Sequence, residues 1–260
     1  MTSRPTPLRT FRQDRLHVQI YASRLEMGQA AAADVAQRMQ ELLARQERVR
    51  MVFAAAPSQN EFLATLAGWP GLDWRRVEAF HMDEYVGLPA DAPQGFANFL
   101  RQRLWNLVKP GRVECLNGNA PDLQAECARY SALLQERPID IVCAGIGENG
   151  HMAFNDPPVA DFNDPQLVKI VTLDPVCRMQ QVHDGAFATL DEVPKQALTM
   201  TMPALMSARW LYCVVPGPTK TEAVYRTLQG PISTACPATI MRRHANAILY
   251  LDQESAAKLP

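Results

Sequence analysis

Residues 139–157 read Ile-Asp-Ile-Val-Cys-Ala-Gly-Ile-Gly-Glu-Asn-Gly-His-Met-Ala-Phe-Asn-Asp-Pro, and this stretch decides the fold. The apolar run 139–144 is typical of a strand that is buried on both faces of a parallel sheet. The glycines that follow let the backbone turn tightly where that strand ends. Ligands of open α/β sheets bind outside the carboxyl ends of the strands. His151 and Asp156 on this loop therefore predict proton transfer on a small polar molecule.

The same stretch has two other interpretations. Its glycines fit the pattern G-x-G-x-x-G, which alone is a weak signal of dinucleotide binding. A dinucleotide fingerprint should open a helix near the start of a βαβ unit, whereas Asn155-Asp156-Pro157-Pro158 stops a helix almost at once. A purely structural turn, in which His151 only satisfies local backbone groups, also stays open at this point.

Outward from this loop, apolar runs alternate with runs of helical spacing. We expect strands at 51–56, 77–80, 139–144, 168–173, 210–215 and 247–251, and helices at 26–43, 60–67, 96–108, 121–135, 203–208 and 220–229. Such alternation predicts an α/β fold with a mostly parallel open sheet and helices on both faces. No repeat or composition shift divides the chain, so we expect one domain over residues 16–260. Residues 159–166 and 181–191 are candidate loops or lids.

Composition narrows the class of protein. The 260 residues are 47% hydrophobic and carry a net charge of −1, which gives no reason to expect nucleic acid or a membrane surface as partner. No apolar run approaches the roughly 18 residues of a membrane span. Residues 1–15 have four arginines and no apolar core, so we expect a flexible arm rather than a secretory signal. The six cysteines match no zinc spacing and predict reduced thiols in a cytoplasmic protein without a metal.

A second polar strand end lies earlier in the chain. Asp83 and Glu84 follow the expected strand 77–80 and precede a loop that contains Gly87 and Pro89. Adjacent acids at a strand end are most often only solvated. Two polar strand ends in one parallel sheet nevertheless make a shared crevice more plausible.

Residues 82–88 and 145–157 resemble the two signature loops of the glucosamine-6-phosphate deaminase (isomerising) family, within the superfamily that also holds the 6-phosphogluconolactonases. The resemblance runs from about residue 49 to residue 251. It includes segments 116–122, 193–199 and 216–220 and the arginine at position 178. It implies a Rossmann-like α/β fold of the deaminase/isomerase type. It also implies a reaction that opens the ring of an amino sugar phosphate, moves a proton from C2 to C1 and expels ammonia.

The resemblance assigns roles to the polar residues of the two loops. Asp83 matches the base that moves the proton between the two carbons. His151 matches the group that opens the ring, since its unperturbed pKa lies near working pH. Asn149 and Asp156 match its two orienting partners. The family usually has Glu at position 156, so the shorter Asp156 predicts a lost or water-mediated contact with His151. The family often has Asp at position 149, and Asn orients an imidazole without stabilising its charged form.

Substrate binding is less certain from the sequence. The glycine-rich backbone, including Gly147 and Gly150, is expected to offer N–H donors to developing negative charge. The family cradles phosphate on a Gly- and Thr-rich loop, whereas residues 55–60 here read Ala-Ala-Pro-Ser-Gln-Asn. The proline at 57 removes an N–H donor, and Ser58 keeps a hydroxyl. Arg178 and Lys220 match the family's phosphate-binding cations, although Lys220 could also be merely exposed in a first helical turn.

The leading hypothesis is a cytoplasmic enzyme that deaminates glucosamine 6-phosphate to fructose 6-phosphate, without metal or organic cofactor. The resemblance also allows a homo-oligomer. Two alternatives share the fold: a 6-phosphogluconolactonase-like hydrolase, and a sugar-phosphate sensor without turnover. Retention of Asp83 and His151 argues against the sensor, because binding alone needs no proton-relay base. His81, two residues before Asp83, is a further candidate to line the pocket.

Overall fold

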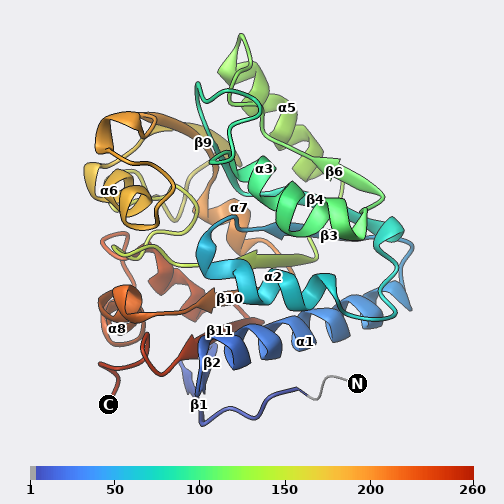
Figure 1. Cartoon of the computed structure of the whole chain (residues 1–260), viewed down its shortest axis with the longest axis vertical. Coiled ribbons are helices and arrows are strands. Elements are labelled where there is room, and N and C mark those ends of the chain that lie inside the picture. Colours follow the sequence, from blue (N-terminus) through green and yellow to red (C-terminus); the bar gives the residue numbers. More distant parts are fainter. Residues whose placement is uncertain (1–3) are drawn as a thin grey trace.

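An eight-stranded sheet forms the centre of the computed structural model, which describes residues 4–260 (Figure 1). The strand order is β1 (Arg9–Gln13), β2 (Leu16–Tyr21), β11 (Ala247–Asp252), β10 (Trp210–Val215), β7 (Ile141–Ala144), β3 (Val49–Phe53), β4 (Val77–His81) and β6 (Arg112–Glu114). Only β1 runs antiparallel to its neighbour. The predicted α/β fold with a mostly parallel open sheet is therefore confirmed.

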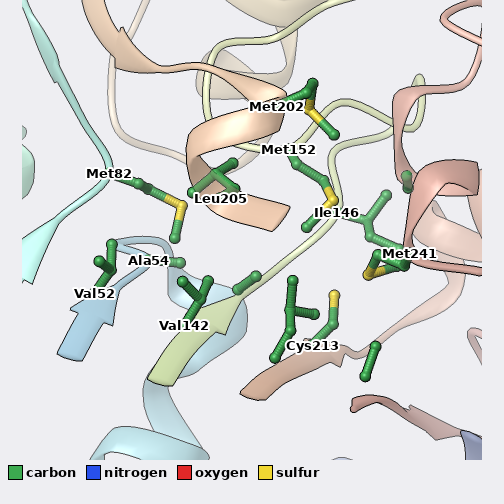
Figure 2. Close-up of a cluster of buried hydrophobic side chains, with 14 of the residues drawn as sticks. Val52, Ala54, Met82, Val142, Ile146, Met152, Met202, Leu205, Cys213 and Met241 are labelled. Atoms are coloured by element: carbon green, nitrogen blue, oxygen red, sulfur yellow. The ribbon is translucent and has the colours of Figure 1, made fainter. Parts of the chain in front are cut away.

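Helices cover both faces of this sheet because its strands are apolar on both sides. The helices are α1 (Arg24–Leu43), α2 (Asn60–Ala67), α3 (Phe96–Leu100), α4 (Asn106–Val108), α5 (Leu123–Gln135), α6 (Pro175–His183), α7 (Met202–Met206) and α8 (Thr221–Gln229). One buried cluster joins alternate strand residues to α1 and α2. The other joins the remaining strand residues to α5, α7 and α8. Figure 2 shows Val52 and Val142 in this second cluster, with Leu205 of α7 above them.

Helix starts follow the sequence signals closely. Ser23 accepts a hydrogen bond from the Glu26 backbone N–H at the start of α1, and Asp122 accepts two at the start of α5. The helix expected over 96–108 is present but contains a π-helical turn at Arg101–Trp105. None of the helices within residues 4–260 is long and apolar enough to cross a membrane.

The expected flexible arm is wrong for residues 9–13, because they form the edge strand β1. Five residue pairs join β1 to β2, and Leu8 N–H donates to the Ile20 carbonyl at 2.7 Å. Of the four arginines that suggested an arm, Arg9 and Arg12 lie on this edge strand and are exposed. Charged side chains on an edge strand disfavour pairing with another chain. Residues 1–3 of the expected arm lie outside the described residues. The boundaries of the single domain stay a prediction.

A second sheet was not anticipated. It has three antiparallel strands in the order β5 (Asp83–Tyr85), β9 (Gln196–Met200) and β8 (Val168–Thr172). The run expected at 168–173 is thus a strand, but it does not join the main sheet. Asp83 lies opposite Thr199 in this small sheet. The small sheet therefore holds the Asp83 backbone directly beyond the end of β4.

The carboxyl ends of four neighbouring parallel strands position the site. Strand β7 lies between β3 and β10, and β4 pairs with the other side of β3. Parallel strands end at the same edge of a sheet, so the segments that follow these four strands lie together. Each of these segments contributes residues to the cavity described next.

Candidate active site

A cavity opens at this edge of the main sheet. Its walls come from the segments after β3, β4, β7 and β10, from Phe96 and from the end of α6. Five of the predicted site residues line it: Ser58, Asp83, Gly147, His151 and Lys220. The cavity therefore brings together residues that are up to 162 positions apart, from Ser58 to Lys220 (220 − 58).

His151 forms one wall and is held by two partners. Its Nδ1 lies 2.8 Å from Asn149 Oδ1 and 3.0 Å from Asp156 Oδ1. Asn149 Nδ2 donates to the same Asp156 oxygen at 2.8 Å. Both Nδ1 neighbours are acceptors, so we assign the imidazole proton to Nδ1. The other ring nitrogen, Nε2, is then free to take a proton from a ligand.

The predicted loss of contact between Asp156 and His151 is wrong. Asp156 is 1% exposed, and the loop before it folds tightly enough to compensate for the shorter side chain. Ala153 has a left-handed φ of 51°, and Asn155 Nδ2 donates to the Met152 and Met200 carbonyls. Burial acts to raise the pKa of Asp156. The nearby His151 charge and hydrogen bonds outweigh burial and lower that pKa, so Asp156 remains a carboxylate.

The two site glycines shape the loop instead of offering free donors. Gly147 N–H donates to the His151 carbonyl at 2.9 Å, and Gly150 N–H donates to the Gly147 carbonyl at 3.0 Å. A Cβ at position 147 would lie 2.1 Å from His151 Cε1. A Cβ at position 150 would lie 2.4 Å from Cys236 Sγ, on a residue whose φ is +87°. The expectation that these N–H groups stabilise ligand charge is therefore not supported.

Asp83 lines the same cavity. It is 7% exposed, and burial, with a smaller effect of Glu84, raises its pKa well above the ordinary range of a carboxyl group. The neighbouring Glu84 has a separate role, because it accepts backbone hydrogen bonds at 3.0 Å from Tyr85, Phe96 and Ala97 and so caps α3. Of this acidic pair, Asp83 is the one that lines the cavity.

His81 is a structural residue and does not line the cavity. Its side chain is fully buried, and Nε2 accepts from the Leu116 backbone N–H at 2.8 Å. Burial lowers the pKa of His81 to about 3, so the ring is neutral at working pH. The interpretation of His81 as a pocket residue is therefore wrong.

Lys220 and Ser58 mark the end of the cavity predicted to bind phosphate. Lys220 is 5% exposed, so the interpretation of a merely exposed lysine is wrong. Burial lowers its pKa, and the negative charges of Asp184 and Glu148 partly offset this effect. Lys220 ends the short turn Pro218–Lys220 immediately before α8. A buried ammonium group that lines a cavity is suited to binding an anion.

Arg178 lies elsewhere. Its guanidinium group donates to the carbonyl of Leu190 at 2.5 Å and to that of Val193 at 2.8 Å. It does not line the cavity. In this structure Arg178 ties α6 to the segment at 190–193. Of the two cations expected to bind phosphate, Lys220 is the one that lines the cavity.

The sequence did not identify four polar residues of the cavity, one of which is Gln59, directly after Ser58. Gln180 and Gln181 lie on α6, and Asp184 follows it. Gln180 Oε1 also accepts from the Glu148 backbone N–H at 2.7 Å, which joins α6 to the His151 loop. The start of α6 does carry a signal, because Asp174 caps the helix and a proline follows at its first position. Helix α6 overlaps the start of the candidate loop 181–191.

His151, Asp156 and Cys177 form the one cluster of potential metal ligands among residues 4–260, with one ligand atom from each within 4.8 Å of the others. Burial and the neighbouring Asp156 charge strongly raise the pKa of the Cys177 thiol, which therefore stays protonated. Two of the three, His151 and Asp156, already contact each other through Nδ1 and Oδ1. The absence of a metal cofactor stays a prediction.

Comparison with known proteins identifies relatives of the chain. Residues 22–250 match the family described as glucosamine-6-phosphate isomerases/6-phosphogluconolactonase. Proteins named glucosamine-6-phosphate deaminase from Bacillus thuringiensis (strain Al Hakam) and Bacillus cereus (strain AH820) are each 39% identical over 184 residues. This alignment covers 71% of this chain and 68% of each relative.

Two solved structures resemble this one. A monomeric glucosamine-6-phosphate deaminase aligns with a TM-score of 0.85 and 30% identity, over 92% of this chain and 98% of its own. A 6-phosphogluconolactonase from Thermotoga maritima aligns with a TM-score of 0.74 over 91% of this chain and 99% of its own. The second pair is 18% identical, so this likeness shows the fold alone.

Proposed function

The chain belongs to the glucosamine-6-phosphate isomerase/6-phosphogluconolactonase family, and from this premise we propose that it deaminates an amino sugar phosphate. The substrate proposed is glucosamine 6-phosphate, and the products are fructose 6-phosphate and ammonia. One observation carries the proposal: Asp83 and a doubly oriented His151 line the same cavity as the buried Lys220. A sugar ring that bridges these groups would present its reacting carbons to both proton-transfer residues.

His151 is proposed to open the ring. Its Nε2 takes the proton of the anomeric hydroxyl group and delivers a proton to the ring oxygen, so that the C1–O bond to the ring breaks. Asp156 and Asn149 fix the ring plane and the tautomer through Nδ1. The Asp156 carboxylate also stabilises the imidazolium that forms between the two transfers.

Asp83 is proposed to move the proton along the open chain. Its carboxylate takes the C2 proton and returns it to C1. The C1 oxygen gains a proton and the amino nitrogen loses one, so the step leaves a hydroxyl group on C1 and a C=N bond at C2. One water then adds to C2 and ammonia leaves, so the product is a ketose. A raised pKa makes the carboxylate a stronger base than an ordinary aspartate, which suits abstraction from carbon.

Lys220 and Ser58 are proposed to hold the 6-phosphate, with Arg178 outside the contact. The chemistry then lies at the other end of the sugar, toward Asp83 and His151. Absence of a cofactor and a cytoplasmic location are also part of the proposal, and each stays a prediction.

A coupled ammonia-release assay tests the proposed function. The panel contains glucosamine 6-phosphate, galactosamine 6-phosphate, free glucosamine and 6-phosphogluconolactone. We expect ammonia from a phosphorylated hexosamine and no accelerated opening of the lactone. Lactone hydrolysis without ammonia release would show a lactonase instead. Tight binding of the sugar phosphate, without turnover of any compound in the panel, would show a sensor.

A further inference from the structure

An acidic side chain lies at the end of the cavity assigned to phosphate. Asp184 follows α6, is half-buried and lines the same cavity as Lys220 and Ser58. Of the negative charges that raise the pKa of Lys220 against the effect of burial, Asp184 has the largest effect. Among the described residues that line the cavity, Lys220 is the one lysine or arginine. A doubly charged phosphate would thus meet one ammonium group and one opposing carboxylate.

The Asp184 carboxylate has acceptor capacity to spare. Its one side-chain hydrogen bond among residues 4–260 is a long one of 3.4 Å from Gln180 Nε2. Titratable groups near Asp184 include Lys220 from the turn before α8, Glu148 from the loop after β7, His183 of α6 and Tyr85 of β5. Asp83 and His151 line the same cavity. Glu148 is occupied by His183, whose Nδ1 lies 3.5 Å from it. Lys220 and Asp184 therefore offer one donor and one acceptor to a ligand in the cavity.

An ionised carboxylate accepts hydrogen bonds and cannot donate them. A phosphate monoester in its singly charged form keeps one P–O–H group, which can donate to such a carboxylate. Its second ionisation has a pKa of about 6, so this form is accessible near neutral pH. A sulfate ester carries the same single charge but has no proton to donate. A carboxylate in an anion site can therefore distinguish the two esters.

We propose that Asp184 is a specificity-determining residue that accepts a hydrogen bond from the protonated phosphoryl oxygen of the substrate, while Lys220 binds an ionised oxygen. The site then selects a phosphate monoester as its monoanion, against a sulfate ester and against the dianion. This inference rests on the proposed function in one respect, namely that the phosphate lies at Lys220.

Calorimetric titration with glucose 6-phosphate and glucose 6-sulfate tests the inference. These ligands have no amino group to lose. They differ only in the ester group at C6, which is a phosphate in one and a sulfate in the other. At pH 5.5 we expect the phosphate to bind at least tenfold more tightly than the sulfate. Between pH 6.5 and pH 7.5 we expect phosphate affinity to fall by up to tenfold, because binding then requires uptake of a proton. Sulfate affinity should stay within about twofold.

Two substitutions and a matched control separate charge from contact. Asp184→Asn should bring the two affinities within about threefold of each other, chiefly by strengthening sulfate binding. Asp184→Glu keeps the carboxylate. The logarithm of its phosphate-to-sulfate affinity ratio should be at least half of the wild-type value. Asp191→Asn removes an exposed carboxylate that does not line the cavity, and it should leave both affinities unchanged. Lys220→Ala should weaken both ligands.

An unchanged phosphate preference in Asp184→Asn would overturn the inference. So would a wild-type protein that binds the sulfate as tightly as the phosphate, or one that binds neither ligand. The ammonia-release assay is independent of these titrations. A protein that deaminates the sugar phosphate but ignores the Asp184 substitution would refute only this inference. A protein that discriminates through Asp184 but releases no ammonia would refute only the proposed reaction.

Discussion

The two ends of the cavity are built differently. At the His151 end, three polar side chains constrain one another through contacts of 2.8 to 3.0 Å, and glycine at position 147 leaves room for the imidazole ring. At the Lys220 end, a buried ammonium group faces open space and an opposing acid, and the expected second cation is turned away. The proposed chemistry thus rests on a rigid constellation, whereas anion binding depends on few contacts. Substitutions at the two ends should therefore change different kinetic constants.

The largest effect should come from Asp83→Asn. The substitution keeps the shape of the side chain but removes the base that we propose moves the C2 proton. We expect kcat to fall by about 10²-fold to 10⁴-fold, while affinity for glucose 6-phosphate stays within about twofold. Steady-state ammonia release gives the first quantity, and calorimetry gives the second. Turnover within a few-fold of wild type would remove Asp83 from this role.

His151→Gln should have the next largest effect, about 10²-fold on kcat for the ring form of the substrate. Because His151 is proposed to act in ring opening, an open-chain substrate should bypass much of this loss. The comparison needs the ratio of rates for the acyclic and cyclic forms in both proteins. Equal impairment on both forms would mean that His151 acts in another step or is structural.

The Lys220 end should respond through KM. Lys220→Ala removes the cavity's ammonium group and should raise KM for the phosphorylated sugar by about 30-fold or more, which corresponds to roughly 2 kcal/mol or above. The change in kcat should be smaller than for Asp83→Asn. Arg178→Ala is the matched control, because Arg178 contacts backbone carbonyls and not the cavity. Arg178→Ala should lower thermal stability and change KM less than threefold. A larger rise in KM for Arg178→Ala than for Lys220→Ala would instead identify Arg178 as the phosphate ligand.

The smallest effect concerns stability and its pH dependence. Burial raises the pKa of Asp83 in the folded chain above its value of about 4 in the unfolded chain. The protonated Asp83 carboxyl group therefore makes its full contribution to the free energy of unfolding below pH 4. That contribution is lost as the pH rises through the folded-state pKa. Asn stays neutral, so Asp83→Asn should be more stable than wild type at pH 8, with a difference that shrinks toward pH 4. Urea unfolding at both pH values checks this, and a variant less stable at pH 8 would contradict the burial argument.

Sequence reasoning succeeded where function depends on strand ends. Buried apolar runs can be recognised in a sequence, and parallel strands place their carboxyl ends at one edge of the sheet. Asp83 and His151 could therefore be predicted to share a crevice. The same reasoning misjudged Asp156, because side-chain length alone does not include the tight turn at Ala153. Loop shape emerges from contacts such as those of Asn155, which no pattern reveals.

The other end was less predictable for a physical reason. Whether Arg178 reaches the cavity depends on how α6 packs and on which carbonyls lie nearby, and both are tertiary properties. Asp184 was missed because the role proposed for it depends on proximity to Lys220, 36 residues later in the chain (220 − 184). The small sheet of β5, β9 and β8 escaped prediction because its strands are short and come from distant parts of the chain.

One measurement tests the central claim most directly: the fate of deuterium placed at C2 of glucosamine 6-phosphate, followed by NMR. If Asp83 carries the proton from C2 to C1, part of the deuterium should appear at C1 of the ketose phosphate product. Ammonia should form in equal amount, and Asp83→Asn should leave the label at C2. Wild-type protein that leaves the label on C2 and releases no ammonia would contradict the account.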